Sequence, residues 1–347
     1  MAWDVLGHTW AVDILRRDLA HDRLKHAYLF TGPEGVGKRT LAAQLARALV
    51  CSAPAASAPC GQCRPCLLSA KAAHPDVFTV APVVSGQRVR AEKIKIEPIR
   101  QLIYDLALKP VEAARRVAVL LRFDAANAEA QNALLKTLEE PPPNVTLLLT
   151  AARADDLLPT IVSRCEVINL RPMPTEAVRE ALITRWLVNA EQAALLAALS
   201  GGRLGWAVRM HADPSALEDR AEKLNDLARL LSATRVHRFA YAEKLARSNG
   251  LDSIQDTLEL WLSIWRDVLL ASARAQAPLA NPDRAADIQQ WAARLAPADV
   301  SQTIHALRRT SDLLERNVNA RLALEVMLLD WPRIAQGQTN VSARLPR

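Results

Sequence analysis

Gly32-Pro-Glu-Gly35-Val-Gly37-Lys38 follows the apolar run Ala27-Tyr-Leu-Phe30, and together they indicate a strand, a glycine-rich loop and the start of a helix. Glycines let backbone amides curl around phosphate groups, and the helix that follows directs its positive end at them. Lys38 can reach the outer phosphates as a point charge. An ordinary glycine-rich turn between a strand and a helix is the alternative. The pattern predicts a phosphate-binding loop with six candidate nucleotide-binding residues: Gly32, Gly35, Gly37, Lys38, Arg39 and Thr40.

The residues that such a loop needs for hydrolysis are replaced. A Ser or Thr hydroxyl normally follows the lysine and ligates Mg²⁺, but Arg39 stands there, and Thr40 is about 100° further round the helix. A buried strand should end on carboxylates that hold the metal, whereas Val117-Ala-Val-Leu-Leu121 is followed by Arg122. Asp124 is a nearby acid, but it would come from the next loop. We therefore expect no Mg²⁺ and almost no hydrolysis by this chain alone. Whether ATP or ADP binds stays open.

Four cysteines are spaced like the ligands of a metal ion. Cys51, Cys60, Cys63 and Cys66 fall within sixteen residues. Four thiolates satisfy tetrahedral Zn²⁺ and leave no open position, which is typical of a structural site. Unpaired thiols and an iron–sulfur cluster are the alternatives. His74 is near enough in sequence to be a ligand, but the cysteines already complete the set, so we interpret it as a packing or capping residue.

The order of elements indicates an α/β part followed by an all-α part. Apolar runs of strand type alternate with helical stretches, as in a parallel sheet. These runs are at 27–30, 76–80, 117–121, 145–149 and 167–170. Later segments have helical patterns, broken at Ser200-Gly-Gly202 and at several prolines. We predict a sheet domain (1–172) with a zinc module (about 51–75), a small helical domain (173–212), a larger helical domain (213–335) and a disordered tail (336–347).

Composition restricts the setting more than the function. The chain has 347 residues, of which half are apolar, so it can bury a sizeable core. Its net charge of +7 permits contact with nucleic acid but does not require it. Residues 1–20 include charged side chains and contain no uninterrupted apolar run. We therefore expect no signal peptide, no membrane contact and a cytoplasmic location.

Two sets of side chains could touch DNA, and both have a simpler interpretation. Four basic residues are scattered, so we interpret them as solvated: Arg115, Arg116, Arg220 and Lys223. Four tryptophans lie in the helical part, and we interpret them as core packing and not as stacking platforms: Trp261, Trp265, Trp291 and Trp331.

Four motifs occur in a fixed order along the chain. They are His26-Ala-Tyr-Leu-Phe30, the four-cysteine module, Asn132-Ala-Leu-Leu-Lys-Thr-Leu-Glu-Glu-Pro141 and Ser163-Arg164-Cys165. Together they resemble the AAA+ subunits of bacterial sliding-clamp loaders, over about residues 1–210. The segment 317–325 is similar to the last helix of that family's collar. The resemblance implies an AAA+ sheet domain with an inserted zinc module, a helical lid and a C-terminal helical collar.

The resemblance also separates two kinds of subunit. The gamma/tau kind hydrolyses ATP and is similar in having a complete phosphate loop, an Asp-Glu strand end and a lid arginine that senses the γ-phosphate. This chain departs at all three places, with Arg39, with Leu121-Arg122, and with Gly205 near the lid position, although Arg203 is two residues away. The chain is thus more similar to the non-hydrolysing subunit of the ring.

In this family the Ser-Arg-Cys motif is implied to place an arginine in the ATP site of the adjacent subunit, and Arg164 is the matching residue. Without the resemblance, Arg164 would be a surface arginine paired with Glu166. Cys165 is interpreted as a packing residue and not a nucleophile. The helix around 132–140 would be plain and amphipathic on its own, and the resemblance makes it part of a subunit interface.

The function that this resemblance implies is assembly. The chain would form a ring with the gamma/tau and delta subunits and donate Arg164 in trans while the complex places the sliding clamp on primer-template DNA. Two alternatives stay open. One is an ATP-hydrolysing clamp-loader subunit that uses Asp124 and Thr40, and the other is a zinc-dependent DNA-binding module.

Overall fold

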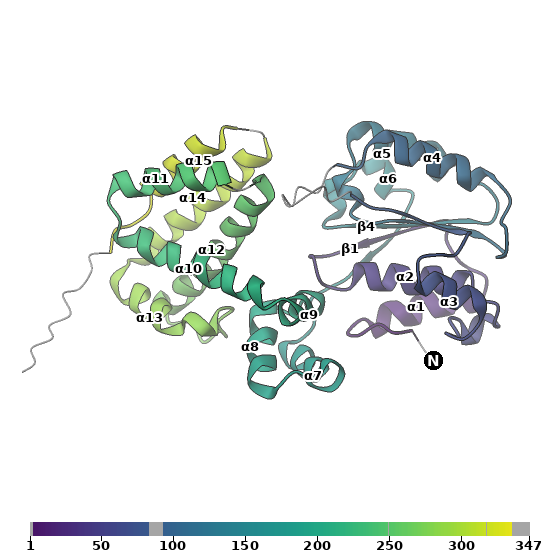
Figure 1. Ribbon diagram of the computed structural model, residues 1–347, viewed down its shortest axis with the longest axis horizontal. Coiled ribbons are helices and arrows are strands. Elements are labelled where there is room, and N and C mark those ends of the chain that lie inside the picture. Colours follow the sequence, from purple (N-terminus) through teal and green to yellow (C-terminus); the bar gives the residue numbers. More distant parts are fainter. Residues whose placement is uncertain (1–2, 83–92, 249, 317, 335–347) are drawn as a thin grey trace, which may run out of the picture. The chain divides into compact units, whose positions relative to one another are not determined.

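The computed structural model describes residues 3–82, 93–248, 250–316 and 318–334. The chain divides into two compact units with a boundary between His211 and Ala212. The first contains a parallel sheet with helices and the second contains helices, so the predicted change from α/β to all-α is confirmed (Figure 1). In the described part of the chain, no helix has the length and apolar character needed to cross a membrane. The expected tail, 336–347, lies outside the described residues.

In the part of the first unit that the structure describes, the sheet has five parallel strands. They are β1 (Ala27–Thr31), β2 (Val77–Val80), β3 (Arg116–Leu120), β4 (Val145–Ala151) and β5 (Glu166–Asn169). Their order in the sheet is β2-β3-β4-β1-β5, which places β1 and the loop that follows it between β4 and β5. All five strands were predicted, with differences of one or two residues at their ends. Three of them, β1, β3 and β4, are buried along their whole length, which is why they have continuous apolar sequences.

Helices cover both faces of this sheet (Figure 1). On one face Tyr28 and Phe30 of β1 pack with residues of α1 and α2, and on the other face Leu29 packs with residues of α4 and α5. This alternation follows from the strand period of two. The helices of the sheet region are α1 (Thr9–Ala20), α2 (Lys38–Leu49), α3 (Arg64–Ala70), α4 (Ile96–Ala107), α5 (Ala128–Glu139) and α6 (Pro159–Val162).

Three short helices complete the first unit: α7 (Thr175–Trp186), α8 (Ala190–Ser200) and α9 (Leu204–Ala212). The predicted break at Ser200-Gly-Gly202 lies between α8 and α9. Gly201 ends α8 in the left-handed conformation, with φ +56°. A Cβ on Gly202 would lie 2.2 Å from the Met173 carbonyl oxygen, so a larger residue cannot make this turn without a shift. These helices fall in the segment 173–212, for which the sequence predicts a small helical domain.

In its described residues, the second unit contains six α-helices: α10 (Pro214–Ser232), α11 (Arg235–Ser248), α12 (Leu251–Ser272), α13 (Ala285–Arg294), α14 (Pro297–Glu315) and α15 (Ala320–Leu329). Its core contains the four predicted tryptophans, and all four are buried. The Trp331 ring packs edge-on against Trp261 and Trp265, with centroids 5.1 and 5.8 Å apart. The interpretation of the tryptophans as core packing is confirmed.

The interpretation of all four scattered basic residues as solvated is wrong for Arg116 and Arg220. Arg116 is buried beside Asp76, and its Nη2 donates to the Lys109 carbonyl at 2.6 Å. Arg220 is buried and pairs with Asp283 at 2.6 Å. Buried charges are expensive unless they are paired, and each of these has a carboxylate partner. Both arginines therefore stabilise the fold and are not available as DNA contacts.

Candidate functional site

The glycine-rich loop links β1 to α2, as predicted. Gly37 forms the N-cap of α2 with φ +116°, a conformation that only glycine adopts easily. Gly32 has φ +136°, and a Cβ there would lie 2.4 Å from the Leu170 carbonyl oxygen. The buried His8 ring supports the loop from α1, since its Nε2 lies 2.8 Å from the Val36 carbonyl oxygen. The loop is thus held in shape by contacts from elements far apart in the sequence.

Lys38 lies at the start of α2, and its ammonium group contacts the loop itself. Nζ donates to the carbonyl oxygens of Gly32 and Pro33, the latter at 3.0 Å. Desolvation by burial lowers the pKa of Lys38, and the charges of Asp124 and Glu34 partly oppose this shift. The side chains of Arg39 and Thr40 are exposed.

Leu121 and Arg122 follow β3 directly, at the place where a hydrolysing site would have carboxylates. Leu121 is buried, and Arg122 adopts a left-handed conformation with φ +50°. Asp124 follows in a short 3-10 turn, where its Oδ2 accepts a hydrogen bond from the Ala152 amide at 3.3 Å. The Gly32 amide donates to the Ala152 carbonyl oxygen at 3.1 Å, so Asp124 and the glycine-rich loop contact the same residue. Asp124 is the acid that the hydrolysing alternative requires, and it comes from the loop after β3, not from the strand end.

The first turn of α9 packs directly against the glycine-rich loop. The Gly205 amide donates to the Gly35 carbonyl oxygen at 2.8 Å, and a Cβ on Gly205 would lie 2.9 Å from that oxygen. One turn later Arg209 forms an ion pair with Glu34 at 2.6 Å. Arg203 donates to the Ser200 carbonyl at 2.8 Å and lies over the Trp206 ring. From the sequence, Gly205 is notable only because it falls near the position where the gamma/tau kind has an arginine. The structure shows in addition that Gly205 lies close to Gly35 and that this contact requires a small residue.

We expect Gly205→Ala to lower the free energy of unfolding by about 1–3 kcal/mol, because the added methyl group overlaps backbone atoms of the loop. Urea denaturation of the full chain followed by circular dichroism measures the change. Gly250→Ala is the comparison variant, since a Cβ at Gly250 meets nothing within 4 Å and only the smaller cost of replacing the glycine N-cap of α12 is expected. Equal stability of the two variants would contradict the importance of the Gly35–Gly205 contact.

Arg164 lies just after α6 and before β5, and its partners differ from the simple expectation. Its Nη2 pairs with Glu139 Oε1 at 2.7 Å, and its Nη1 donates to the Thr160 carbonyl at 2.9 Å. The alternative interpretation, in which Arg164 pairs with Glu166, is therefore wrong, because Arg164 pairs with Glu139. Glu139, at the end of α5, was missed as a site residue because it is 25 positions away. Next to Arg164, burial raises the pKa of the Cys165 thiol to about 12, which fits a packing role.

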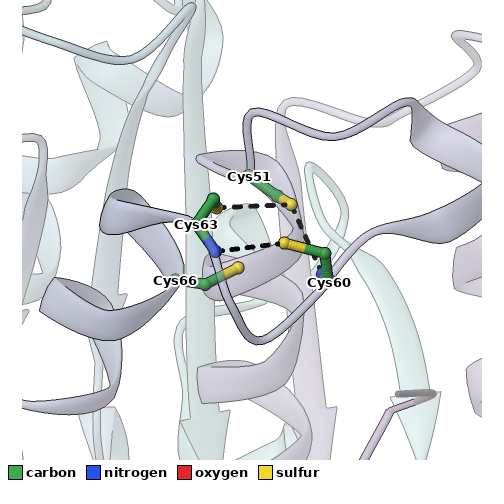
Figure 2. Close-up of side chains that lie close together, drawn as sticks. All are labelled: Cys51, Cys60, Cys63 and Cys66. Atoms are coloured by element: carbon green, nitrogen blue, oxygen red, sulfur yellow. Dashed lines mark hydrogen bonds between the residues drawn. The ribbon is translucent and has the colours of Figure 1, made fainter.

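The four predicted cysteines come together. Cys51 follows α2, Cys60 lies in the loop, Cys63 is the N-cap of α3 and Cys66 lies inside α3. All four Sγ atoms lie within 4.8 Å of one another, and Figure 2 shows the side chains directed at a common centre. Tetrahedral zinc with Zn–S bonds of about 2.3 Å requires sulfur atoms about 3.8 Å apart. The Cys51–Cys63 distance is 3.8 Å, so the group fits such an ion.

Hydrogen bonds to sulfur also favour metal binding here. Backbone amides of Gln62 and Cys63 lower the pKa of Cys60 to about 6, whereas burial raises the pKa of Cys66 to about 12. A bound cation would favour the thiolate at both positions. His74 is buried outside this group, and its Nδ1 accepts a hydrogen bond from the Asp76 amide at 3.0 Å. The interpretation of His74 as a capping residue is confirmed.

Two family models match most of the chain. Residues 7–174 match "DNA polymerase III, delta subunit", and residues 214–333 match "DNA polymerase III, delta subunit, C terminal". A DNA polymerase III subunit delta' from Pseudomonas aeruginosa is 40% identical over 209 residues, which cover 59% of this chain and 61% of the relative. The subunit delta' of Bacillus subtilis is 29% identical over 91% of this chain and 93% of its own length. The subunit tau of Escherichia coli is 32% identical over 52% of this chain and 27% of its own length.

Proposed function

Because the chain belongs to the delta' family of DNA polymerase III clamp-loader subunits, we propose that it assembles with gamma/tau and delta subunits to load the sliding clamp on primed DNA. In this proposal the chain does not hydrolyse ATP. It supplies Arg164 to the ATP site of the adjacent subunit. The proposed setting is the cytoplasm.

One contrast between two sites carries the proposal. The site within the chain has Arg39 where a Mg²⁺ ligand belongs and Leu121-Arg122 where carboxylates belong. Removing a single oriented catalytic group typically costs about two or more orders of magnitude in rate, so several replacements leave almost no activity. By contrast, the side chain of Arg164 is 34% exposed, and it precedes β5, the edge strand of the sheet. Such an arginine can neutralise charge that develops on a γ-phosphate.

An exposed apolar stripe on the second unit supports the assembly role. Leu322, Val326 and Leu329 are spaced along one side of α15, and Val318 precedes them; all four are exposed. The opposite side of α15 is buried in the core of the unit through Leu324 and other residues. A helix that is apolar on both sides is typical of an element covered by a second chain. We assign this stripe to the contact with neighbouring clamp-loader subunits in the collar.

The remaining parts have supporting roles in the proposal. Zn²⁺ held by the four cysteines would stabilise the module at 51–75, and would take no part in catalysis because no coordination position stays open. The contact between α9 and the glycine-rich loop would keep the lid and the sheet region together. DNA and the clamp would be bound through the complex.

The isolated chain is expected to show no steady-state ATPase activity above that of its Lys38→Ala variant, because Mg²⁺ ligands and acids are replaced. A coupled phosphate-release assay on the purified chain measures this. An isolated gamma/tau subunit assayed at the same concentration serves as the positive control. Turnover that disappears in Lys38→Ala would refute the proposal and favour the hydrolysing alternative, with Asp124 as the acid.

A further inference from the structure

Glu139 forms the ion pair of Arg164, the proposed arginine finger. Its Oε1 holds Arg164 Nη2 at 2.7 Å, while Thr160 at the start of α6 holds Nη1 at 2.9 Å. The two contacts come from different elements, α5 and α6, and they engage different nitrogens of the same planar group. The guanidinium has five N–H donors, so donors remain for a third partner. The Arg164 side chain is therefore restrained, and its guanidinium still has N–H groups that can donate to a phosphate.

The place of Glu139 in its helix is unfavourable by itself. It is the last residue of α5, where the carbonyl groups give the helix end a partial negative charge, and a carboxylate there is repelled. Glu140 follows directly and adds a second negative charge. The Arg164 guanidinium offsets this repulsion. The same cluster of negative charge draws the guanidinium to one position.

Resting on the proposed function, we infer that Glu139 is a positioning residue for Arg164, which fixes the guanidinium at the subunit edge before the neighbour's nucleotide arrives. An unrestrained arginine must lose rotamer freedom when it enters a phosphate site, and a side chain that is already held loses less. Glu139 itself does not touch the reacting groups. Its effect on the neighbour's ATP site passes through Arg164.

The test uses the reconstituted clamp-loader complex and its DNA- and clamp-stimulated ATPase activity. Glu139→Gln keeps the size of the side chain but removes the charge, and we expect kcat to fall about 2- to 5-fold, the range set by a partly exposed ion pair. KM for ATP should stay unchanged, because the finger acts on charge that develops in the transition state. The matched control is Glu176→Gln, which removes an exposed carboxylate that pairs with Arg179 and not with Arg164, and it is expected to behave like the parent chain.

Arg164 variants separate this inference from the proposed function. In an Arg164→Ala background, Glu139→Gln should cause no further loss, because its effect passes through Arg164. If Arg164→Ala lowers kcat while Glu139→Gln matches the parent chain or is faster, the positioning role is wrong and the finger stands. An equal loss from Glu139→Gln in both backgrounds means a general structural effect and also overturns the inference. If Arg164→Ala has no effect, the finger assignment fails, and the positioning role fails with it.

Discussion

Replacing Cys60 by serine is expected to abolish metal binding and to unfold the module at 51–75. Structural zinc contributes about 10–16 kcal/mol of binding free energy in small zinc domains, and a tetrahedral site with three thiolates loses most of it. The metal content of the purified chain, measured by mass spectrometry, should fall from about one ion per chain to nearly none. Limited proteolysis should then cut within 51–75.

Cys165→Ser is the matched control, since Cys165 lies outside the group of four thiols and packs against the core of the sheet. It should keep its metal and its resistance to protease within the module. Acid should have the same effect as Cys60→Ser on the parent chain. The metal requires thiolates, so binding is favoured at higher pH and is lost as pH falls and protons compete for sulfur. Full metal content in Cys60→Ser would contradict a four-thiolate site.

Replacing Arg164 by alanine should lower the ATPase activity of the reconstituted complex roughly 10-fold or more, because a guanidinium that stabilises transition-state charge is removed. Folding and assembly should stay nearly intact, since the contacts of Arg164 are partly exposed. Steady-state kinetics of the complex, with size-exclusion chromatography of the same samples, measures both effects.

Two variants make this test specific. Arg153→Ala removes an exposed arginine whose partner is Asp155, and its complex should keep parent activity. Arg164→Lys keeps the charge but loses the planar fork, so it should recover only part of the rate. Parent-like activity of Arg164→Ala in an intact complex would show that the neighbour's site does not use this arginine.

Local patterns predicted most of the fold. The strands were recognisable because β1, β3 and β4 are buried on both faces, which makes their sequences continuously apolar. The cysteine group was recognisable because its ligands are close in sequence and the spacing is typical of a small metal module.

The errors and omissions all concern contacts between distant residues. The burial of Arg116 depends on Asp76, 40 positions earlier, and the burial of Arg220 depends on Asp283, 63 positions later. Composition alone does not show whether an arginine has such a partner. The pairing of Arg164 with Glu139 was missed for the same reason, since Glu166 is nearer in sequence but the end of α5 is nearer in space.

The contact between Gly35 and Gly205 restricts which residue position 205 can hold. Restoring the missing carboxylates and the hydroxyl next to Lys38 would change exposed or strand-end positions one at a time. Restoring an arginine at Gly205 is different, because any side chain there meets the backbone of the loop. An arginine at position 205 would require α9 to move away and lose its hydrogen bond to Gly35. The packing of α9 on the glycine-rich loop therefore excludes an arginine at position 205 unless the backbone shifts.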